Sequence, residues 1–537
     1  MFRPWLFLSF TILELVGLTF ERPLTISQTI LSVSEGTSLH GGTKVLILGG
    51  GVAGVSAARA LHEQGISDFI ILEARDQLGG RMMSHTFGVQ DKNYTVEVGA
   101  NWIQGTRSVT GTENPIWSIA KKHNVATRTS HYSSSLTTYD DAGLCEFWDI
   151  FKASSESFKR LIASAGSRAP KRLVDMSARS GYSLTGSRPD SRHAMAAEYY
   201  RFDWEFAATP EDTSWLASSW VFMFACPSSS DDTSGLFRKK SAHNNTFRPD
   251  AGGFSPENLL AVDQRGFKTL IQAEAESFLQ PHQLRLNSTV SAIWTAKHGV
   301  QVVLTSGETL TADYALCTFS LGVLQNDDIQ FVPELPAWKQ EAIHSMTMST
   351  YTKIFLQFPQ KFWFDTEMAL YADHERGRYP VWQSLDHEDF FPGSGIIFVT
   401  VTGEFSKRVE SMPDSHVKSE VLSVLQSMYP NTCIPEPLDF YFQRWHSDPL
   451  FHGSYSNWPA SFMSEHQGNL RATVEERLWF AGEATSKKYF GYLHGAYYEG
   501  QDIGRRLAEC VKGGGCVTLK HIEWVQNARP YDAMASI

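Results

Sequence analysis

The chain has 537 residues, of which 42% are hydrophobic and 20% charged, a composition typical of globular proteins. This length exceeds what one hydrophobic core usually serves, so we expect two domains. The formal net charge of −11 argues against nucleic acid as the main partner and is compatible with a cationic ligand. The six cysteines form no C-x-x-C pair, so the sequence predicts no metal site.

The first twenty residues have the pattern of a secretory signal peptide. Arg3 supplies a positive charge, and Trp5 to Leu13 form an apolar run of suitable length. Glu14 interrupts the run, which is too short to cross a bilayer, so we expect no stable membrane span. Residues 1–20 therefore predict a secreted protein, and the alternative is an intracellular protein with a frayed tail.

A strand, a turn, a helix and a second strand are predicted between residues 44 and 73. The runs Lys44–Leu48 and Phe69–Leu72 are apolar and β-branched, as in buried parallel strands. An alanine-rich helix lies between them and ends near Gly65. The turn before this helix has G-x-G-x-x-G spacing, with glycines at Gly49, Gly51 and Gly54.

This frame predicts a dinucleotide-binding site. Gly49 would form the tight turn, Gly51 would let a pyrophosphate approach the backbone, and Gly54 would allow close helix–strand packing. The first N–H groups of the helix would face the phosphates. Glu73 follows the second strand at the spacing where a carboxylate binds the ribose hydroxyls. A glycine-rich surface loop would not explain this combination.

A second glycine pair indicates which of two common dinucleotides, FAD or NAD, the chain binds. From Ala74 the chain reads A-R-D-Q-L-G-G-R, in which Gly79 and Gly80 free the backbone and Arg81 can contact phosphate. This segment resembles one in the flavin-containing amine oxidase family, where it wraps FAD. The resemblance favours FAD over NAD, because pyridine-nucleotide dehydrogenases do not need such a segment.

Further motifs follow in the order found in that family. They read V-E-V-G-A-N-W-I-Q-G from Val96, F-D-W-E-F from Phe202, D-Q-R-G from Asp263, F-S-L-G-V-L from Phe319, Y-T-K-I-F-L-Q-F from Tyr351, Y-S-N-W-P from Tyr455, W-F-A-G-E-A-T from Trp479 and G-Y-L-H-G-A-Y from Gly491. Over residues 43–510 the chain is most similar to polyamine oxidases of the plant catabolic type.

The resemblance implies an α/β fold with a Rossmann-like FAD-binding domain. An interleaved α+β substrate-binding domain would be built on a mixed sheet flanked by helices. The FAD-binding domain would take residues 43–125, 219–328 and 445–512, the substrate-binding domain 126–218 and 329–444, and a C-terminal tail 513–537.

Local patterns add smaller predictions. Val300–Leu304 and Leu310–Ala315 predict a hairpin that feeds a buried strand, and Val417–Met428 predicts a helix. The polar stretch Cys226–Pro256 predicts a surface excursion. Cysteine positions predict a buried thiol at Cys317 and, in an oxidising compartment, a possible pair of Cys510 with Cys516.

The resemblance implies oxidation of an amine by hydride transfer to flavin N5, with O₂ reduced to H₂O₂ and the imine hydrolysed to an aldehyde and an amine. Lys353 of the Y-T-K motif is implied as the catalytic residue, contacting flavin N5 through a water. From residue type alone, Lys353 would be a solvated strand-end lysine. The implied FAD contacts are Gly49, Gly51, Gly54, Glu73, Arg75, Gly80, Arg81, Gly99, Ala100, Asn101, Trp102, Trp445, Gly482, Glu483, Gly491 and Tyr492. Binding should be non-covalent, because monoamine oxidases attach flavin through a cysteine in the stretch corresponding to 445–459, and this chain has none there.

The implied substrate contacts are Gln104, Glu205, Phe206, Tyr351, Tyr455 and Tyr492. Aromatic faces suit the methylenes and ammonium groups of a polyamine, and Glu205 would pair with a distal ammonium. Taken singly, these aromatics would more often be core residues, and Glu205 a surface ion-pair partner. Gln104 departs from the family, in which plant enzymes carry Glu and animal relatives His. A neutral amide cannot pair with an ammonium, although it could satisfy backbone groups instead.

Two alternatives remain open at this stage. L-Amino-acid and monoamine oxidases share the FAD frame, but the former need an arginine beside the flavin, and no matched substrate position is Arg. A catalytically silent flavoprotein scaffold is the second alternative, against which the intact Lys353 speaks. The expected partners are dioxygen and a polyamine, namely spermine, spermidine or their N-acetylated forms.

Overall fold

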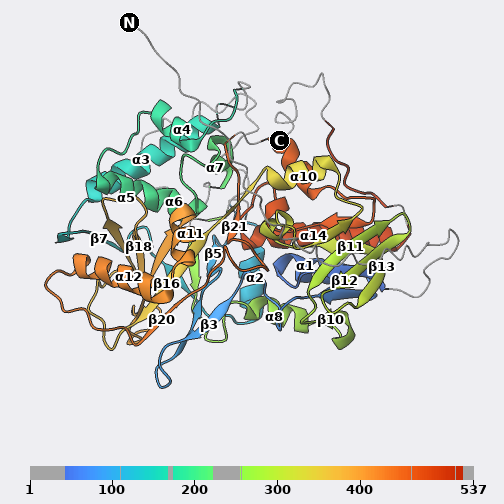
Figure 1. Ribbon diagram of the computed structural model, residues 1–537, viewed down its shortest axis with the longest axis horizontal. Coiled ribbons are helices and arrows are strands. Elements are labelled where there is room, and N and C mark those ends of the chain that lie inside the picture. Colours follow the sequence, from blue (N-terminus) through green and yellow to red (C-terminus); the bar gives the residue numbers. More distant parts are fainter. Residues whose placement is uncertain are drawn as a thin grey trace, which may run out of the picture. The chain divides into compact units, whose positions relative to one another are not determined.

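The computed structural model describes residues 43–108, 111–166, 168, 173–221, 254–255, 257–460, 463–513 and 516–523 (Figure 1). All of them lie in one compact unit, Gly41–Ile537. The predicted signal peptide lies outside the described residues, as does most of the stretch Cys226–Pro256. Among the helices that are described, none combines the length and apolar character that crossing a bilayer requires.

An eight-stranded mixed sheet contains the predicted N-terminal frame. Its strands run in the order β10-β2-β1-β13-β12-β11-β14, and β22 pairs with β13. β1 lies parallel to both β2 and β13. The bounds are β1 Thr43–Leu48, β2 Phe69–Leu72, β10 Leu284–Arg285, β11 Val290–Ala296, β12 Gly299–Leu304, β13 Thr309–Cys317, β14 Gln330–Val332 and β22 Leu478–Phe480. The predicted strands and the hairpin are confirmed, and the buried thiol of Cys317 ends β13.

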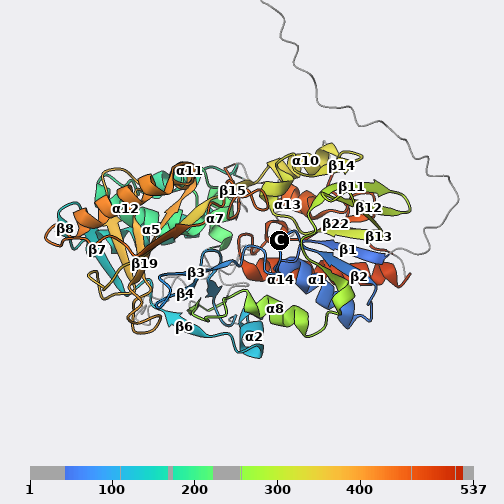
Figure 2. The same cartoon turned by 60° about the horizontal axis from the view of Figure 1, so that its bottom comes forward.

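Both faces of this sheet are buried, since successive strand residues point to opposite sides. Leu46 and Leu48 belong to one apolar cluster, and Val45 and Ile47 belong to another. Helices α1 (Val52–Glu63), α8 (Thr269–Glu276) and α14 (Leu493–Val511) cover the second face, and α1 and α14 lie side by side (Figure 2). Their close approach needs glycine, because a Cβ on Gly500 of α14 would stand 2.2 Å from the Ala53 oxygen of α1.

A seven-stranded mixed sheet has the strand order β20-β16-β19-β18-β17-β7-β8. Its bounds are β7 Leu136–Asp140, β8 Gly143–Leu144, β16 Tyr351–Gln357, β17 Met368–Ala372, β18 Val381–Ser384, β19 Ile396–Thr402 and β20 Asp439–Phe442. Helix α12 (Asp414–Met428), which includes the predicted helix, packs against one face, and α3 (Trp148–Ala165) and α5 (Arg192–Arg201) pack against the other. Mixed sheets covered by helices confirm the predicted α/β class.

The remaining elements lie outside the two large sheets, and some of them line the site. They are β3 Ser84–Phe87, β4 Tyr94–Glu97, β5 Trp102–Gln104, α2 Pro115–Lys122, β6 Thr127–Ser130, α4 Ala178–Leu184, α6 Asp203–Phe206, α7 Trp215–Val221, β9 Asn258–Ala261, η2 Pro281–Gln283, α9 Leu321–Leu324, α10 Ala337–His344, β15 Thr347–Ser349, α11 Gly403–Ser411, β21 Tyr455–Asn457, α13 Ser464–Arg471 and η3 Glu483–Thr485. Most strands of each sheet come from the segments predicted for one domain, but β14 lies in the predicted substrate segment and pairs with β11. The division into two domains stays a prediction.

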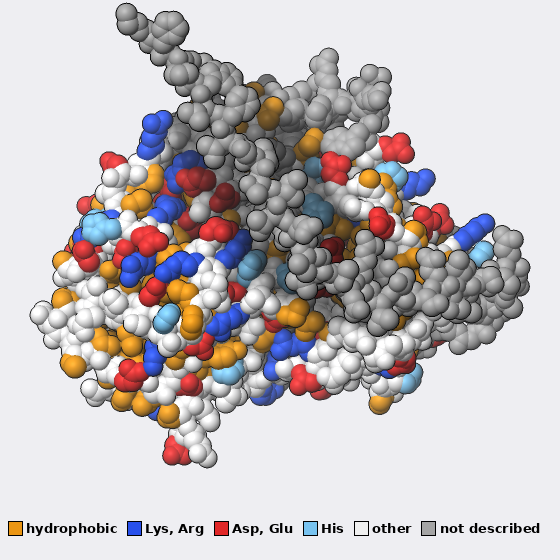
Figure 3. Space-filling view, viewed as in Figure 1, with side chains coloured by type: hydrophobic (Ala, Val, Ile, Leu, Met, Phe, Trp, Pro, Cys, Tyr) orange, Lys and Arg blue, Asp and Glu red, His pale blue; other side chains and the backbone are white. Residues whose placement is uncertain are grey.

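A disulfide lies near the C-terminal end of the described residues. Cys510, at the end of α14, forms the anticipated disulfide with Cys516. On the face shown in Figure 3, basic and acidic side chains of the described residues lie interspersed.

Candidate active site

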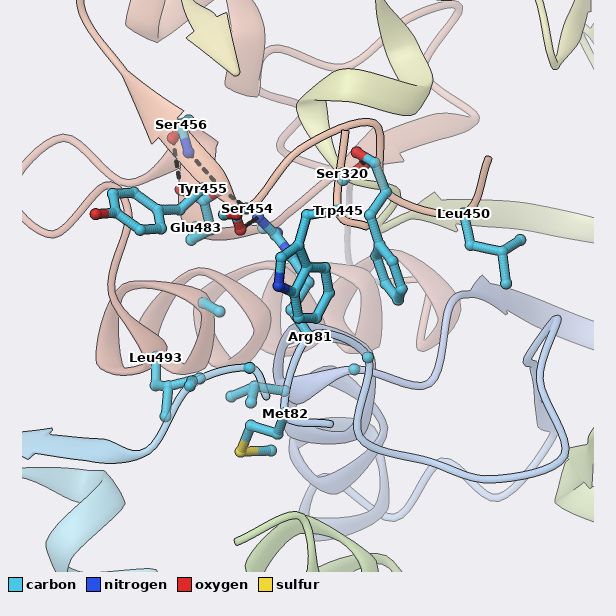
Figure 4. Close-up of a pocket in the computed structure, with 18 of the residues that line it drawn as sticks. Arg81, Met82, Ser320, Trp445, Leu450, Ser454, Tyr455, Ser456, Glu483 and Leu493 are labelled. Carbon is cyan, nitrogen blue, oxygen red and sulfur yellow. Dashed lines mark hydrogen bonds and ion pairs between the residues drawn. The ribbon is translucent and has the colours of Figure 1, made fainter. Parts of the chain in front are cut away.

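A cavity of about 670 Å³ opens at the carboxyl ends of the parallel strands. Gly49 follows β1, Glu73 follows β2 and Thr318 follows β13, and all three residues line the cavity. Its lining also includes Tyr351 and Lys353 of β16, so residues from both large sheets share one cavity. Figure 4 shows part of this lining around Trp445.

The cavity brings together every predicted site residue except Gly54. These residues are Gly49, Gly51, Glu73, Arg75, Gly80, Arg81, Gly99, Ala100, Asn101, Trp102, Gln104, Glu205, Phe206, Tyr351, Lys353, Trp445, Tyr455, Gly482, Glu483, Gly491 and Tyr492. Gly54 lies beneath the turn, where an added Cβ would stand 2.0 Å from the Gly49 oxygen. That contact is the close helix–strand packing for which its position predicts glycine.

The glycine turn forms a cradle that side chains would fill. Gly49 has φ +112°, which disfavours other residues, and an added Cβ on Gly80 would stand 3.2 Å from the Gly51 Cα. Helix α1 begins at this turn with Gly51 as its N-cap and no side-chain cap. Its N-terminal N–H groups and dipole can therefore bind an anion such as a pyrophosphate.

Glu73 closes the other side of this cradle. Its carboxylate accepts hydrogen bonds from the N–H groups of Gly50 (2.7 Å) and Arg75 (2.9 Å). Burial raises its pKa, and these hydrogen bonds oppose the increase. Each carboxylate oxygen can accept a further bond, so Glu73 can still bind ribose hydroxyls.

Arg81 and Glu483 contact each other, rather than each facing a ligand alone. The Arg81 Nη1 donates to Glu483 Oε1 at 2.8 Å and to the Ser454 oxygen at 3.0 Å (Figure 4). Glu483 also accepts from the N–H and hydroxyl of Ser456 and from the N–H of Gly491. Glu483 therefore holds three distant segments of the chain together at the cavity wall.

Lys353 is buried, not solvated at a strand end, and only 4% of it is exposed. Its Nζ donates to the backbone oxygens of Gly99 (2.7 Å) and Glu97 (3.1 Å). Burial lowers the pKa of Lys353 to about 7, although the charge of Glu97 opposes this. Tyr351 precedes Lys353 by two strand residues, so both point to the same side of β16 and into the cavity.

Two of the predicted substrate residues, Tyr455 and Tyr492, contact Glu205 in this cavity. The hydroxyl of Tyr492 donates to the Glu205 carboxylate, and that of Tyr455 donates to the Glu205 backbone oxygen at 2.7 Å. Burial raises the pKa of Glu205, while the Tyr492 bond lowers it. Gln104 lines the cavity and, within the described part of the chain, its side-chain amide makes no hydrogen bond. That amide is available to a ligand.

Sequence reasoning missed several lining residues. Trp204 and Tyr132 join Trp102 in an aromatic wall, with ring centroids 5.7 Å apart for Trp204 and Tyr132 and 5.9 Å apart for Tyr132 and Trp102. Trp204 stands inside the F-D-W-E-F motif, which could have identified it. Tyr132 belongs to no motif, and only the tertiary structure places it here.

The comparisons with known proteins agree with this geometry. The family model for flavin containing amine oxidoreductases matches residues 52–507. The chain belongs to this family. It is 35% identical to polyamine oxidase 6 of Oryza sativa subsp. japonica over 515 residues, which cover 92% of this chain and 95% of that protein. It is 34% identical to polyamine oxidase 1 of Zea mays over 511 residues, with 90% and 95% covered.

A solved structure shares the fold of this oxidoreductase. A redesigned double mutant of putrescine oxidase has a TM-score of 0.64 at 15% identity, over 87% of this chain and 98% of that one. Membership of the family confirms the predicted resemblance and implies a flavin cofactor. The glycine cradle, the uncapped α1 N-terminus and Glu73 fit the dinucleotide part of such a cofactor.

Proposed function

We propose that this oxidoreductase binds FAD non-covalently and oxidises a polyamine such as spermidine, spermine or an N-acetylated form. The observation that carries the proposal is the continuity of one cavity. It has a phosphate-binding turn at Gly49–Gly51, the buried amine of Lys353, and a carboxylate at Glu205 among aromatic rings. An electron-accepting cofactor and an alkylammonium can therefore share it.

The cofactor proposal rests on the cradle and on the residue types around it. A dinucleotide would place its pyrophosphate at the α1 N-terminus and its ribose at Glu73. No cysteine lines the cavity among the described residues, which supports non-covalent binding. When bound, a flavin accepts a hydride from the amine α-carbon and passes the electrons to O₂, giving H₂O₂.

The substrate proposal rests on charge and ring faces. Glu205 offers a negative charge to one ammonium, and the rings of Phe206, Tyr351, Tyr455 and Tyr492 can cover the methylenes and add cation–π attraction of about 0.5–2 kcal/mol each. Gln104 adds an amide that can accept from an amine nitrogen without supplying charge. This wall suits a long amine with one strongly held distal charge.

Lys353 is proposed to hold a water and to exchange a proton with it at Nζ. Nζ donates two hydrogen bonds to backbone oxygens, and these two bonds fix the direction of its remaining proton or lone pair. A lysine whose pKa lies near 7 can be an acid or a base at neutral pH. Lys353 would thereby assist imine hydrolysis or reoxidation of the cofactor.

Oxidation of an L-amino acid is less well supported by the cavity. The arginines that line it are Arg75 and Arg81, and Arg81 is paired with Glu483. The guanidinium of Arg81 also donates to the Ser454 oxygen, next to Tyr455, so the protein itself engages it on two sides. The part of the cavity formed by Glu205 and the tyrosines carries a carboxylate. A substrate carboxylate would meet Glu205 there and be repelled.

An assay of H₂O₂ production tests the function. The purified holoenzyme would be given spermidine, spermine, their N-acetyl forms, a monoamine and L-amino acids, with product identification. We expect peroxide, an aldehyde and a second amine from at least one polyamine. Oxidation of amino acids alone, or no reduction of the bound flavin by any amine, would contradict the proposal.

Secretion is also proposed. It rests on the signal-like residues 1–20 and on the Cys510–Cys516 disulfide, a bond that persists in oxidising compartments. Expression of the full chain in a secreting host, with N-terminal sequencing of the exported protein, tests this. Retention inside the cell with residues 1–20 intact would favour the intracellular alternative.

A further inference from the structure

Helix α6 presents three consecutive residues to the cavity, although it is only four residues long. Trp204, Glu205 and Phe206 line the cavity, and Ala207 ends the helix with φ +51°. So short a helix has few internal hydrogen bonds and cannot fix its own orientation. The orientation of Glu205 must therefore be set by contacts outside the helix.

The first residue of α6 makes such a contact. Asp203 does not line the cavity, and its two carboxylate oxygens accept from the guanidinium of Arg376, at 2.6 Å from Nη2 and 3.2 Å from Nε. A bidentate pair fixes both the distance and the rotation of the two groups. Arg376 stands between β17 and β18, so this contact connects α6 to the seven-stranded sheet.

Arg376 is itself held by a chain of charges. Its Nη1 lies 3.0 Å from Glu198 of α5, which pairs with Arg179 of α4, and Arg179 pairs with Glu211 at 2.6 Å. The side chains of Asp203 and Glu198 are 3% and 4% exposed, whereas that of Glu211 is 53% exposed. The inner members are buried and mutually paired, and the outer one faces solvent.

Glu205 is thus held from two sides. Tyr492 and Tyr455 contact it from the cavity, through its carboxylate and its backbone oxygen. Arg376 holds Asp203, which lies two residues before Glu205 in the same helix and outside the cavity. Loss of the Asp203–Arg376 ion pair would let the Glu205 carboxylate move relative to Lys353, which lies on strand β16.

We propose that Asp203 and Arg376 are positioning residues for the substrate, which hold α6 so that Glu205 meets the distal ammonium of the amine. This inference rests on the proposed role of Glu205. It assigns control of amine affinity to an ion pair that does not touch the substrate. The hydride-transfer geometry, which depends on other parts of the wall, should be largely unaffected.

The test compares Asp203→Asn with a matched control, Glu211→Gln, in the holoenzyme. Both replace a carboxylate of the same charge chain by an amide, but Glu211 does not contact Asp203's helix. With spermidine, or the best substrate found, we expect Asp203→Asn to raise KM and the Kd from anaerobic flavin reduction about tenfold, with kcat within threefold. Glu211→Gln should leave all three values unchanged. Flavin content and the unfolding midpoint report whether the fold is intact.

A double-mutant cycle separates positioning from a general loss of structure. Glu205→Gln alone should raise Kd, and adding Asp203→Asn to it should raise Kd by much less than tenfold, because the carboxylate to be positioned is gone and only the weaker contacts of Trp204 and Phe206 still depend on α6. Arg376→Gln keeps Asp203 and should give the same tenfold effect. It replaces Asp203→Asn in the cycle if that variant does not fold.

The outcomes are distinguishable. If Glu205→Gln leaves Kd unchanged, the proposed role of Glu205 fails and the positioning inference fails with it. If Glu205→Gln raises Kd but Asp203→Asn and Arg376→Gln do not, only the inference is overturned. Effects of Asp203→Asn and Glu205→Gln that multiply in the double variant would also overturn it, as would a loss confined to kcat.

Discussion

Replacement of Lys353 by methionine should make the protein more stable and less active. The pKa of Lys353 is lowered from 10.5 to about 7, which corresponds to about 5 kcal/mol of unfavourable free energy when the lysine is charged in the fold. Methionine removes this cost but leaves the backbone oxygens of Glu97 and Gly99 without their donor, at about 1–2 kcal/mol each. We expect Lys353→Met to raise the unfolding free energy at pH 7 by about 1–3 kcal/mol.

The difference in unfolding free energy between Lys353→Met and the wild type should depend on pH. Between pH 7 and 10.5 the unfolded chain keeps the lysine proton while the native protein has lost it, so wild-type stability rises with pH. Lys353→Met lacks this rise, and its advantage over the wild type should shrink by about 2 kcal/mol between pH 7 and 9. Urea unfolding curves at both pH values, followed by tryptophan fluorescence, measure the difference.

Activity supplies the second half of the test. Amine-dependent peroxide formation should fall on the order of 10²-fold in Lys353→Met, as expected for loss of a proton-transfer group. Lys339→Met is the matched control. Lys339 is equally buried, donates to the backbone oxygens of Leu470 and Ala472, and does not line the cavity. It should change stability but leave the rate unaltered. If Lys353→Met is less stable than the wild type and keeps the same pH slope, Lys353 is not destabilised by its burial. If the variant is fully active, Lys353 is not a proton-transfer group.

Three further predictions concern the cavity. Gln104→Glu should lower the Kd for spermidine or spermine several-fold in anaerobic titrations, because it adds a charge where the amide is bonded to none of the described residues; unchanged affinity would mean that Gln104 does not face the substrate. Acid precipitation should release FAD into the supernatant, whereas flavin in the pellet would show a covalent bond. Gly80→Ala should weaken flavin retention at least tenfold by fluorescence, because its Cβ would crowd Gly51, while Gly65→Ala, with a similar positive φ and open space, should not; equal losses would point to backbone strain alone.

Local patterns were sufficient for the N-terminal frame. A buried strand, a helix with an N-terminal glycine turn and a second strand each depend on interactions within a few residues, so β1, α1 and β2 lie where the pattern predicts them. The motif resemblance identified site residues that, apart from Gly54, all line the cavity, because those residues keep their order and spacing along the chain, but it left more than half of the lining unassigned.

Those local patterns do not predict which groups surround each side chain. Glu483 pairs with Arg81 across 402 positions, and Arg376 pairs with Asp203 across 173. Tyr132 reaches the aromatic wall without any motif. Such contacts depend on how the sheets and helices pack, which no short segment determines.

Local spacing and chemistry specify the strand–helix–strand frame with its glycine turn and the residue types available to a ligand, whereas the class of fold was implied by the resemblance of the motifs to a known family. The burial of Lys353 against two carbonyl oxygens and the contacts that hold Glu205 from both sides became evident from the packed structure alone. Burial and pairing set the proton affinity and orientation of a group, and both arise from atoms brought together from distant parts of the chain.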